Sequence, residues 1–183
     1  MKKLQIFLVV ILLLILSKNA AIASDQAYGS SAVLASAIDD RTNDNRAQIL
    51  EDFLNSYNSP LSAYSGDFVK SADKYNLDWR LVASIAGVES TFGKHIPYNS
   101  QNAWGWGIYG DNVLRFNSWP EAIETISKGL REGYLKDNPE SNPYVIGPTY
   151  AASPTWAVRV DYFMQKIEDY RLRNAKSTLT VTI

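Results

Sequence analysis

The chain has 183 residues, and its 19 acidic side chains almost balance its 18 basic ones. If the first 23 residues are removed, Lys2, Lys3 and Lys18 are lost. The remaining 15 basic and 19 acidic residues give a formal charge of −4, which argues against nucleic acid as a partner. The sequence contains no cysteine, which excludes disulfides and thiolate chemistry, and about 160 remaining residues suit one packed domain.

The first 23 residues have the pattern of a secretory signal peptide. Two lysines are followed by the apolar run Leu4 to Leu16, and small residues at Ala21 and Ala23 precede Ser24. The run is shorter than the roughly 18 residues expected of a spanning helix. We therefore expect export to the cell envelope or medium, without stable membrane insertion after cleavage. Retention as an N-terminal anchor is the alternative.

Residues 24–43 mix small and acidic side chains and are predicted to be a flexible leader. A helical domain is predicted over 44–173. Its first helix ends near Asn58-Ser59-Pro60, and its second begins after Ser65. Residues 79–93 form the third helix, with Asp78 as its N-cap and Gly93 closing it in a left-handed conformation.

The segment from Lys94 to Asn117 has no helical period and contains three pairs of an aromatic residue and glycine. Irregular segments of this length in compact domains are usually functional or disordered, and the aromatic content argues against disorder. The capping-box sequence Ser118-Trp119-Pro120-Glu121 starts a fourth helix. After a polar loop over Lys136 to Ser153, a fifth helix reaches about Arg173. The tail 174–183 is predicted to be frayed or a short edge strand. The fold class is therefore all-α, or α with a minor β-hairpin.

Glu89 lies at the end of the third helix, at helical spacing from Val82, Ile85 and Ala86. Its carboxyl is therefore expected on the core side and at the negative end of the helix dipole. Both effects favour the protonated carboxyl, which is the form that a general acid needs. The structural alternative is a helix-end glutamate directed to solvent.

The stretch LVASIAGVESTFG, together with the later Ser100, the Asn102–Gly107 segment and Tyr150-Ala151, resembles the lysozyme-like superfamily of peptidoglycan glycosidases. The most similar groups are soluble lytic transglycosylases, goose-type lysozymes and bacterial N-acetylglucosaminidases. The resemblance covers roughly residues 67–167. It implies a lysozyme-like helical domain with a cleft between helices and a long Trp/Gly-rich loop.

The resemblance also implies roles for individual residues. Glu89 matches the catalytic acid, and Tyr150 matches a tyrosine that faces the N-acetyl group of the cleaved sugar. Asp111 is the nearest candidate for a second carboxylate. The residues expected to bind substrate are Ser90, Ser100, Asn102, Trp104, Trp106 and Tyr109. Structural roles for Trp104 and Tyr150 are the alternatives.

One departure concerns the turn Gly105-Trp106-Gly107-Ile108, where many transglycosylases and goose-type enzymes have Gly-Leu-Met-Gln. The Trp-Gly-Trp-Gly sequence of residues 104–107 is more similar to the glucosaminidase branch. The implied reaction is cleavage of the β-1,4 glycan of peptidoglycan, with the acetamido group of the sugar assisting Glu89. The product is an anhydro sugar if the sugar's 6-hydroxyl attacks, and a hydrolysed sugar if water attacks.

A non-catalytic glycan-binding or cell-wall assembly module on the same scaffold is the alternative function, and an inhibitor or adhesin is a further one. His95 is the only histidine and has no cysteine partners, so neither a metal nor another cofactor is expected. We expect a monomer.

Overall fold

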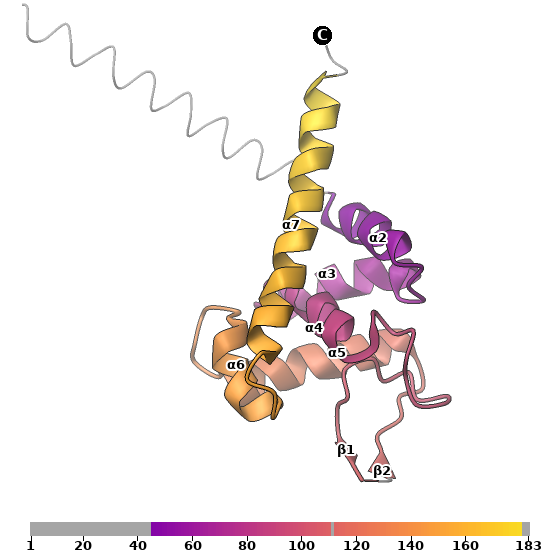
Figure 1. The fold of residues 1–183 in the computed structure, drawn as a ribbon, viewed down its shortest axis with the longest axis vertical. Coiled ribbons are helices and arrows are strands. Elements are labelled where there is room, and N and C mark those ends of the chain that lie inside the picture. The colour runs from indigo at the N-terminus through magenta and orange to yellow at the C-terminus, as the bar shows by residue number, and fades with distance from the viewer. Residues whose placement is uncertain (1–44, 111, 181–183) are drawn as a thin grey trace, which may run out of the picture. The chain divides into compact units, whose positions relative to one another are not determined.

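The computed structural model describes residues 45–110 and 112–180, and this part of the chain is mostly helical (Figure 1). The predicted signal peptide (1–23), the leader (24–43) and Asp111 lie outside the described residues, as does the side chain of Tyr109. Among the described residues, no helix combines the length and apolar character needed to cross a membrane.

The described elements confirm the predicted helices and add to them. In chain order they are α2 (Arg46–Ser56), the 3-10 turn η1 (Ser62–Tyr64), α3 (Ser65–Lys74), α4 (Leu81–Ser90), β1 (Ile108–Tyr109), β2 (Asn112–Val113), α5 (Trp119–Gly129), the π-helix η2 (Leu130–Leu135), α6 (Pro143–Tyr150) and α7 (Trp156–Thr180).

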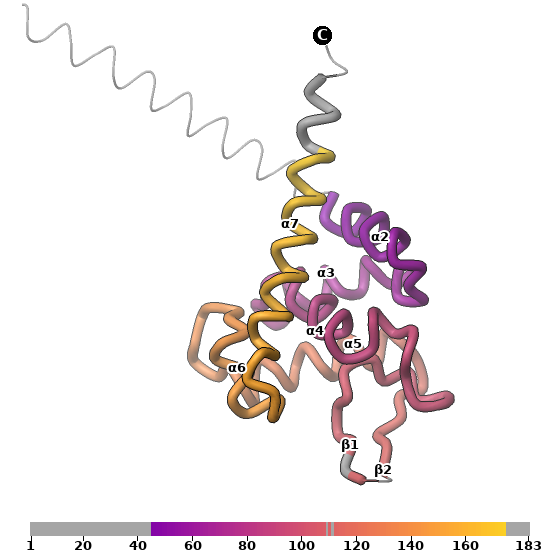
Figure 2. Tube along the Cα trace, in the orientation of Figure 1, coloured from indigo at the N-terminus to yellow at the C-terminus, as the bar shows by residue number. Residues whose placement is uncertain are grey.

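Helix α4 is central to the packing, because eight of its ten residues are buried. A helix that is apolar on all sides needs neighbours on all sides. α4 packs against α7, α3 and α5, and α2 packs against α3 and α7. The Cα trace in Figure 2 follows α7 past α6 and α4 toward α2.

The described residues of the long segment between α4 and α5 include no helix, as predicted. The segment includes one small antiparallel hairpin, in which Ile108 pairs with Val113. Figure 1 shows this hairpin extending away from the helices. The minor β-hairpin anticipated from the sequence is therefore present.

Helix ends follow local side-chain chemistry. The Ser118 hydroxyl accepts a hydrogen bond from the Glu121 amide at 3.3 Å, which confirms this cap. Asp78 Oδ1 accepts from the Arg80 amide at 2.9 Å, although the regular part of α4 begins at Leu81. The other end differs from the prediction, because α4 is closed by Thr91 rather than Gly93. Thr91, Phe92 and Gly93 have φ values of 53°, 57° and 81°, so the left-handed conformation begins two residues early.

Two predictions about the last third of the chain are wrong. The segment Lys136–Ser153 is not all loop, because it contains α6. Asn142 Oδ1 accepts from the Tyr144 amide at 2.9 Å, and Pro143 occupies the first helical position. α7 continues to Thr180, so residues 174–180 are helical rather than frayed or an edge strand.

Candidate active site

Glu89 lies in the last turn of α4, next to the buried Ser90, but Glu89 itself is exposed. The sequence predicts a carboxyl drawn toward the core, and the structure corrects this. Glu89 is the second-to-last residue of α4, and the neighbouring elements leave its side chain exposed. Only its oxygen Oε1 reaches a buried donor.

That donor is Trp156, the first residue of α7. Its indole nitrogen Nε1 donates a hydrogen bond to Oε1 of Glu89 at 2.6 Å. The Trp156 side chain is 2% exposed, so the donor is held by the core. A short bond from a fixed donor to a carboxylate restricts the rotamer of that carboxylate. Glu89 is therefore presented to solvent in one orientation.

Tyr150, the last residue of α6, supports Trp156. The two rings stack with centroids 4.8 Å apart and an interplanar angle of 27°. The Tyr150 hydroxyl donates to the carbonyl oxygen of Trp104 at 2.7 Å. Burial, and then the nearby charge of Glu89 and Tyr134, raise the pKa of Tyr150 well above its ordinary value of 10. The phenol therefore stays protonated across the physiological range and cannot act as a base there.

A cavity of about 340 Å³ lies beside these residues. Its lining residues are Gly105, Trp106, Gly107, Ile108, Tyr134, Thr149 and Tyr150. Glu89 is not itself a lining residue, but a methyl group on Gly105 would lie 3.4 Å from Oε2 of Glu89, so the carboxylate lies next to one residue of the lining. The sequence-predicted Glu89, Trp106 and Tyr150 are thus brought together.

Three aromatic rings form one wall of the cavity. Trp106, Tyr134 and Tyr150 have pairwise centroid distances of 5.9, 5.6 and 5.5 Å. Trp106 is half-buried and packs across Gly129, where an added Cβ would lie 2.5 Å from the indole ring. The wall offers apolar ring faces, as ligand-binding pockets commonly do.

Tyr134 is not among the residues that the sequence predicts at the site. It lies on the π-helix η2, which changes the direction of side chains relative to a continued α-helix. Single turns of π-helix are frequent at functional sites. The sequence around Tyr134 carries no signal from which this local change in winding could be recognised.

Trp104 does not face the cavity, which corrects its predicted role in substrate binding. Its side chain is completely buried, and Nε1 donates to the carbonyl oxygen of Val82 at 2.9 Å. Its ring packs near Phe68 and Trp119. The alternative of a core tryptophan beneath the loop is therefore correct.

Ser90, Ser100 and Asn102 were also predicted to bind substrate, but all three are buried and hold the loop in place. The Ser90 hydroxyl lies 2.8 Å from the Ala103 carbonyl and accepts from the Gly93 amide at 2.8 Å. Ser100 Oγ accepts from the Asn102 amide at 3.2 Å. Their polar atoms therefore have protein partners.

Asn102 is the centre of this loop. Its side-chain nitrogen donates to the carbonyls of Trp106 and Leu114 at 2.7 and 3.0 Å. Its Oδ1 accepts from the Trp106 amide at 3.0 Å. One amide group thus fixes the turn that places Gly105 and Trp106 at the cavity. The prediction of Asp111 as a second carboxylate and that of Tyr109 as a sugar contact both lie outside the described part.

The described residues contain no group of three or more His, Cys, Asp or Glu side chains that could hold a metal ion. No protein-family model matches the chain, and a search among curated proteins finds no match.

Proposed function

We propose that this protein is an exported glycosidase that cleaves the β-1,4 glycan of peptidoglycan, with Glu89 as general acid and base. One observation carries the proposal. An exposed carboxylate, held by the buried Trp156 donor, lies next to Gly105, which lines a cavity of about 340 Å³ with an aromatic wall. Hexosamine rings have apolar faces and polar edges, which suit ring faces beside a positioned carboxyl group.

The chemistry would proceed in two steps. Glu89 protonates the bridging oxygen while the acetamide oxygen of the sugar stabilises the oxocarbenium-like centre, so a second protein carboxylate is not required. Glu89 then removes a proton from the attacking group. Attack by the sugar's own 6-hydroxyl gives an anhydro end, and attack by water gives a reducing end.

The structure also bears on the resemblance to lysozyme-like enzymes. An acid at the end of a buried helix, next to a glycine-rich turn and an aromatic cavity, supports the proposal of a lysozyme-like domain. The Tyr150 hydroxyl already donates to the Trp104 carbonyl, so in this arrangement Tyr150 contributes its ring face to the cavity.

The test is the Glu89→Gln variant assayed on purified cell walls. We expect loss of wall clearing and of released sugar ends, while the melting temperature stays close to that of the wild type. Glu132→Gln, an exposed glutamate on η2, is the matched control and should retain activity. A folded Glu89→Gln protein that clears walls at the wild-type rate would overturn the proposal.

Mass spectrometry of the digest would identify the linkage cut. Anhydro ends, reducing N-acetylmuramic acid and reducing N-acetylglucosamine correspond to three different enzymes. Tight binding of the wild type to cell walls without any released ends would instead identify the non-catalytic alternative.

A further inference from the structure

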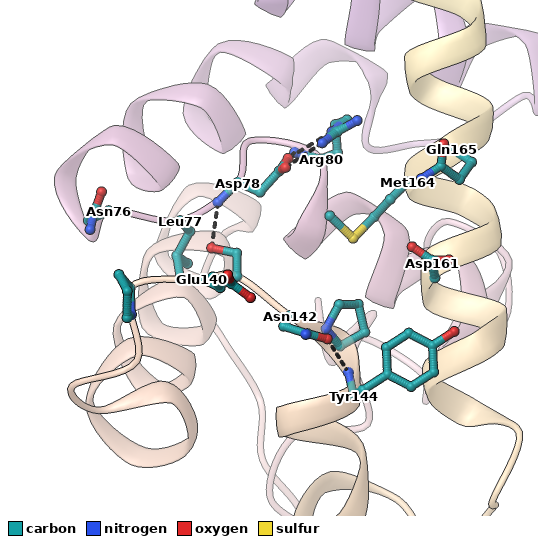
Figure 3. A pocket seen from close by; sticks show the side chains of 13 residues that line it. Asn76, Leu77, Asp78, Arg80, Glu140, Asn142, Tyr144, Asp161, Met164 and Gln165 are labelled. Carbon is teal, nitrogen blue, oxygen red and sulfur yellow. Dashed lines mark hydrogen bonds and ion pairs between the residues drawn. The ribbon is translucent and has the colours of Figure 1, made fainter.

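A second and larger cavity, of about 570 Å³, lies at the opposite end of α4 from Glu89 (Figure 3). It is bounded by the α3–α4 link, residues 139–142, the start of α6 and one face of α7. α4 has ten residues, so its two ends are about 15 Å apart. None of the residues that line this cavity lines the one beside Glu89.

The walls of this cavity are held by hydrogen bonds within the protein. The Asp78 amide donates to the Ser141 hydroxyl at 2.7 Å, which joins two walls directly. Arg131 donates to the carbonyls of Tyr75 and Asn138 at 2.9 and 2.6 Å, behind the same two segments. A cavity with walls fixed in this way needs little ordering when a ligand binds.

The floor of the cavity is apolar. Leu77 and Met164 are 8% and 6% exposed, and Pro143, the first residue of α6, is also buried. Figure 3 shows the Met164 side chain extending from α7 into the space between the walls. Met164 is therefore a reporter placed inside the cavity.

The rim carries carboxylates and amides on two facing walls. Asp161 and Gln165 lie on α7, and Glu140 and Asn142 lie on the opposite segment (Figure 3). Within the described residues, neither Asp161 nor Gln165 makes a side-chain hydrogen bond. Carboxylates accept hydrogen bonds, and amides both donate and accept them. This combination matches a ligand with many hydroxyl and amide groups.

The charges exclude an anionic ligand. Arg80 is the one basic residue of the lining, and Asp78 and Glu168 already bind its guanidinium group. Glu140 and Asp161 add negative charge to the rim. A phosphate or carboxylate group would therefore meet repulsion without a free cation to compensate for it.

Tyr144 lies at one end of the cavity, and its side chain is 53% exposed. An exposed aromatic ring beside amide and carboxylate side chains offers both contacts that a sugar ring needs, namely an apolar face and hydrogen-bonding edges.

We propose that this cavity is a second, non-catalytic binding site for a neutral N-acetylhexosamine oligosaccharide. Tyr144 contacts a ring face, and Asp161 and Gln165 bind polar groups of the sugar. The choice of this sugar class rests on the proposed function, whereas the polar rim, the apolar floor and the exclusion of anions rest on the cavity itself. This site would bind a stretch of the glycan that is not being cleaved.

The test uses the full chain carrying Glu89→Gln, so that no ligand is consumed. The sequence contains only two methionines, Met1 and Met164, so methyl-labelled methionine gives one NMR signal from inside the cavity. Met164→Leu assigns that signal. On titration with N-acetylglucosamine trimer we expect the Met164 signal to shift in a saturable way.

Tyr144→Ala should weaken this binding about tenfold, because the ring contact is lost. Tyr162→Ala is the matched control, since Tyr162 is also 53% exposed but does not line the cavity, and it should bind as before. The proposed site would be overturned if the Met164 signal does not shift, or if Tyr144→Ala binds the trimer as tightly as the protein with Tyr144 intact. It would also be overturned if the Met164 signal responds to lysine amide, a small cationic probe, and not to the sugar.

The two proposals fail separately. If Glu89→Gln abolishes wall cleavage but Met164 does not respond to the trimer, only the second site is overturned. If Met164 responds but Glu89→Gln still clears walls at the wild-type rate, only the catalytic proposal is overturned.

Discussion

The indole nitrogen of Trp156 lies 2.6 Å from Oε1 of Glu89, and this contact joins the first turn of α7 to the last turn of α4. The donor is buried and the acceptor is exposed. The core therefore determines the orientation of a group that remains accessible to a ligand. This relationship leads to the first prediction.

Trp156→Phe keeps an aromatic ring against Tyr150 but removes the donor. A hydrogen bond to a charged group contributes about 1.5–3 kcal/mol when it is shielded and less near solvent. We expect kcat to fall about tenfold, with a smaller change in KM, because the carboxylate loses its fixed orientation. Steady-state kinetics on soluble glycan fragments measures both constants. Trp79→Phe, at a tryptophan that is only partly buried, is the control, and an equal loss there would show a general packing effect.

Tyr150→Phe should change how stability depends on pH. The pKa of Tyr150 is raised in the folded protein, so the folded state keeps a proton that the unfolded state releases above about pH 10. The stability from this group is complete below that pH and is lost as pH rises toward the folded pKa. Thermal unfolding between pH 8 and 11 should therefore show a shallower decline in Tyr150→Phe than in the wild type.

The same variant should also be less stable at neutral pH by about 1–3 kcal/mol, because the Trp104 carbonyl loses its donor. Tyr144→Phe, at an exposed tyrosine, should keep the wild-type slope. If stability falls with pH equally steeply in Tyr150→Phe and in the wild type, the raised pKa of Tyr150 is contradicted.

Gly129→Ala should damage the aromatic wall. The added methyl group would lie 2.5 and 2.8 Å from the Trp106 ring, so Trp106 must move away from Tyr134 and Tyr150. Overpacking of this kind costs about 1–3 kcal/mol. We expect lower stability in urea and a raised KM. Gly133→Ala is the control four residues later, because nothing lies within 4 Å of the position of its Cβ. Similar losses in both variants would argue against a specific role of the Gly129 contact.

Asn102→Asp should destabilise the loop strongly at nearly constant volume. The substitution removes both donors and turns a charged oxygen toward the carbonyls of Trp106 and Leu114. We expect a loss of about 2–4 kcal/mol in urea unfolding, since an unpaired buried charge adds to the lost hydrogen bonds. Asn55→Asp, on the exposed side of α2, should change stability by less than about 0.5 kcal/mol.

The helices were largely predictable because each has a local signal. The capping box at Ser118 and the apolar period of α4 both lie within a few consecutive residues. α6 is not evident in the sequence because its Asn142-Pro143 start is equally typical of a loop, and Gly147 and Pro148 hide its helical period. The wrong prediction therefore came from residues that serve in both loops and helix starts.

The site was only partly predictable because its contacts join distant residues. The location of Glu89 at the end of a helix is a local signal, but the helical period places its carboxyl wrongly on the core side, and its partner Trp156 is 67 residues away. Trp104 and Trp106 are both followed by glycine, and nothing in the sequence distinguishes them. The two differ in the folded structure, because the indole of Trp104 donates a hydrogen bond to the Val82 carbonyl inside the core.

The position of Trp156 at the start of the last helix also affects how the protein is made. During synthesis Glu89 is complete long before its partner leaves the ribosome, and Tyr150 precedes that partner by only six residues. Domains acquire their packing as the chain is completed. A nascent or proteolysed chain that stops before α7 therefore contains Glu89 without the Trp156 donor, so the proposed activity should appear only after α7 has been made.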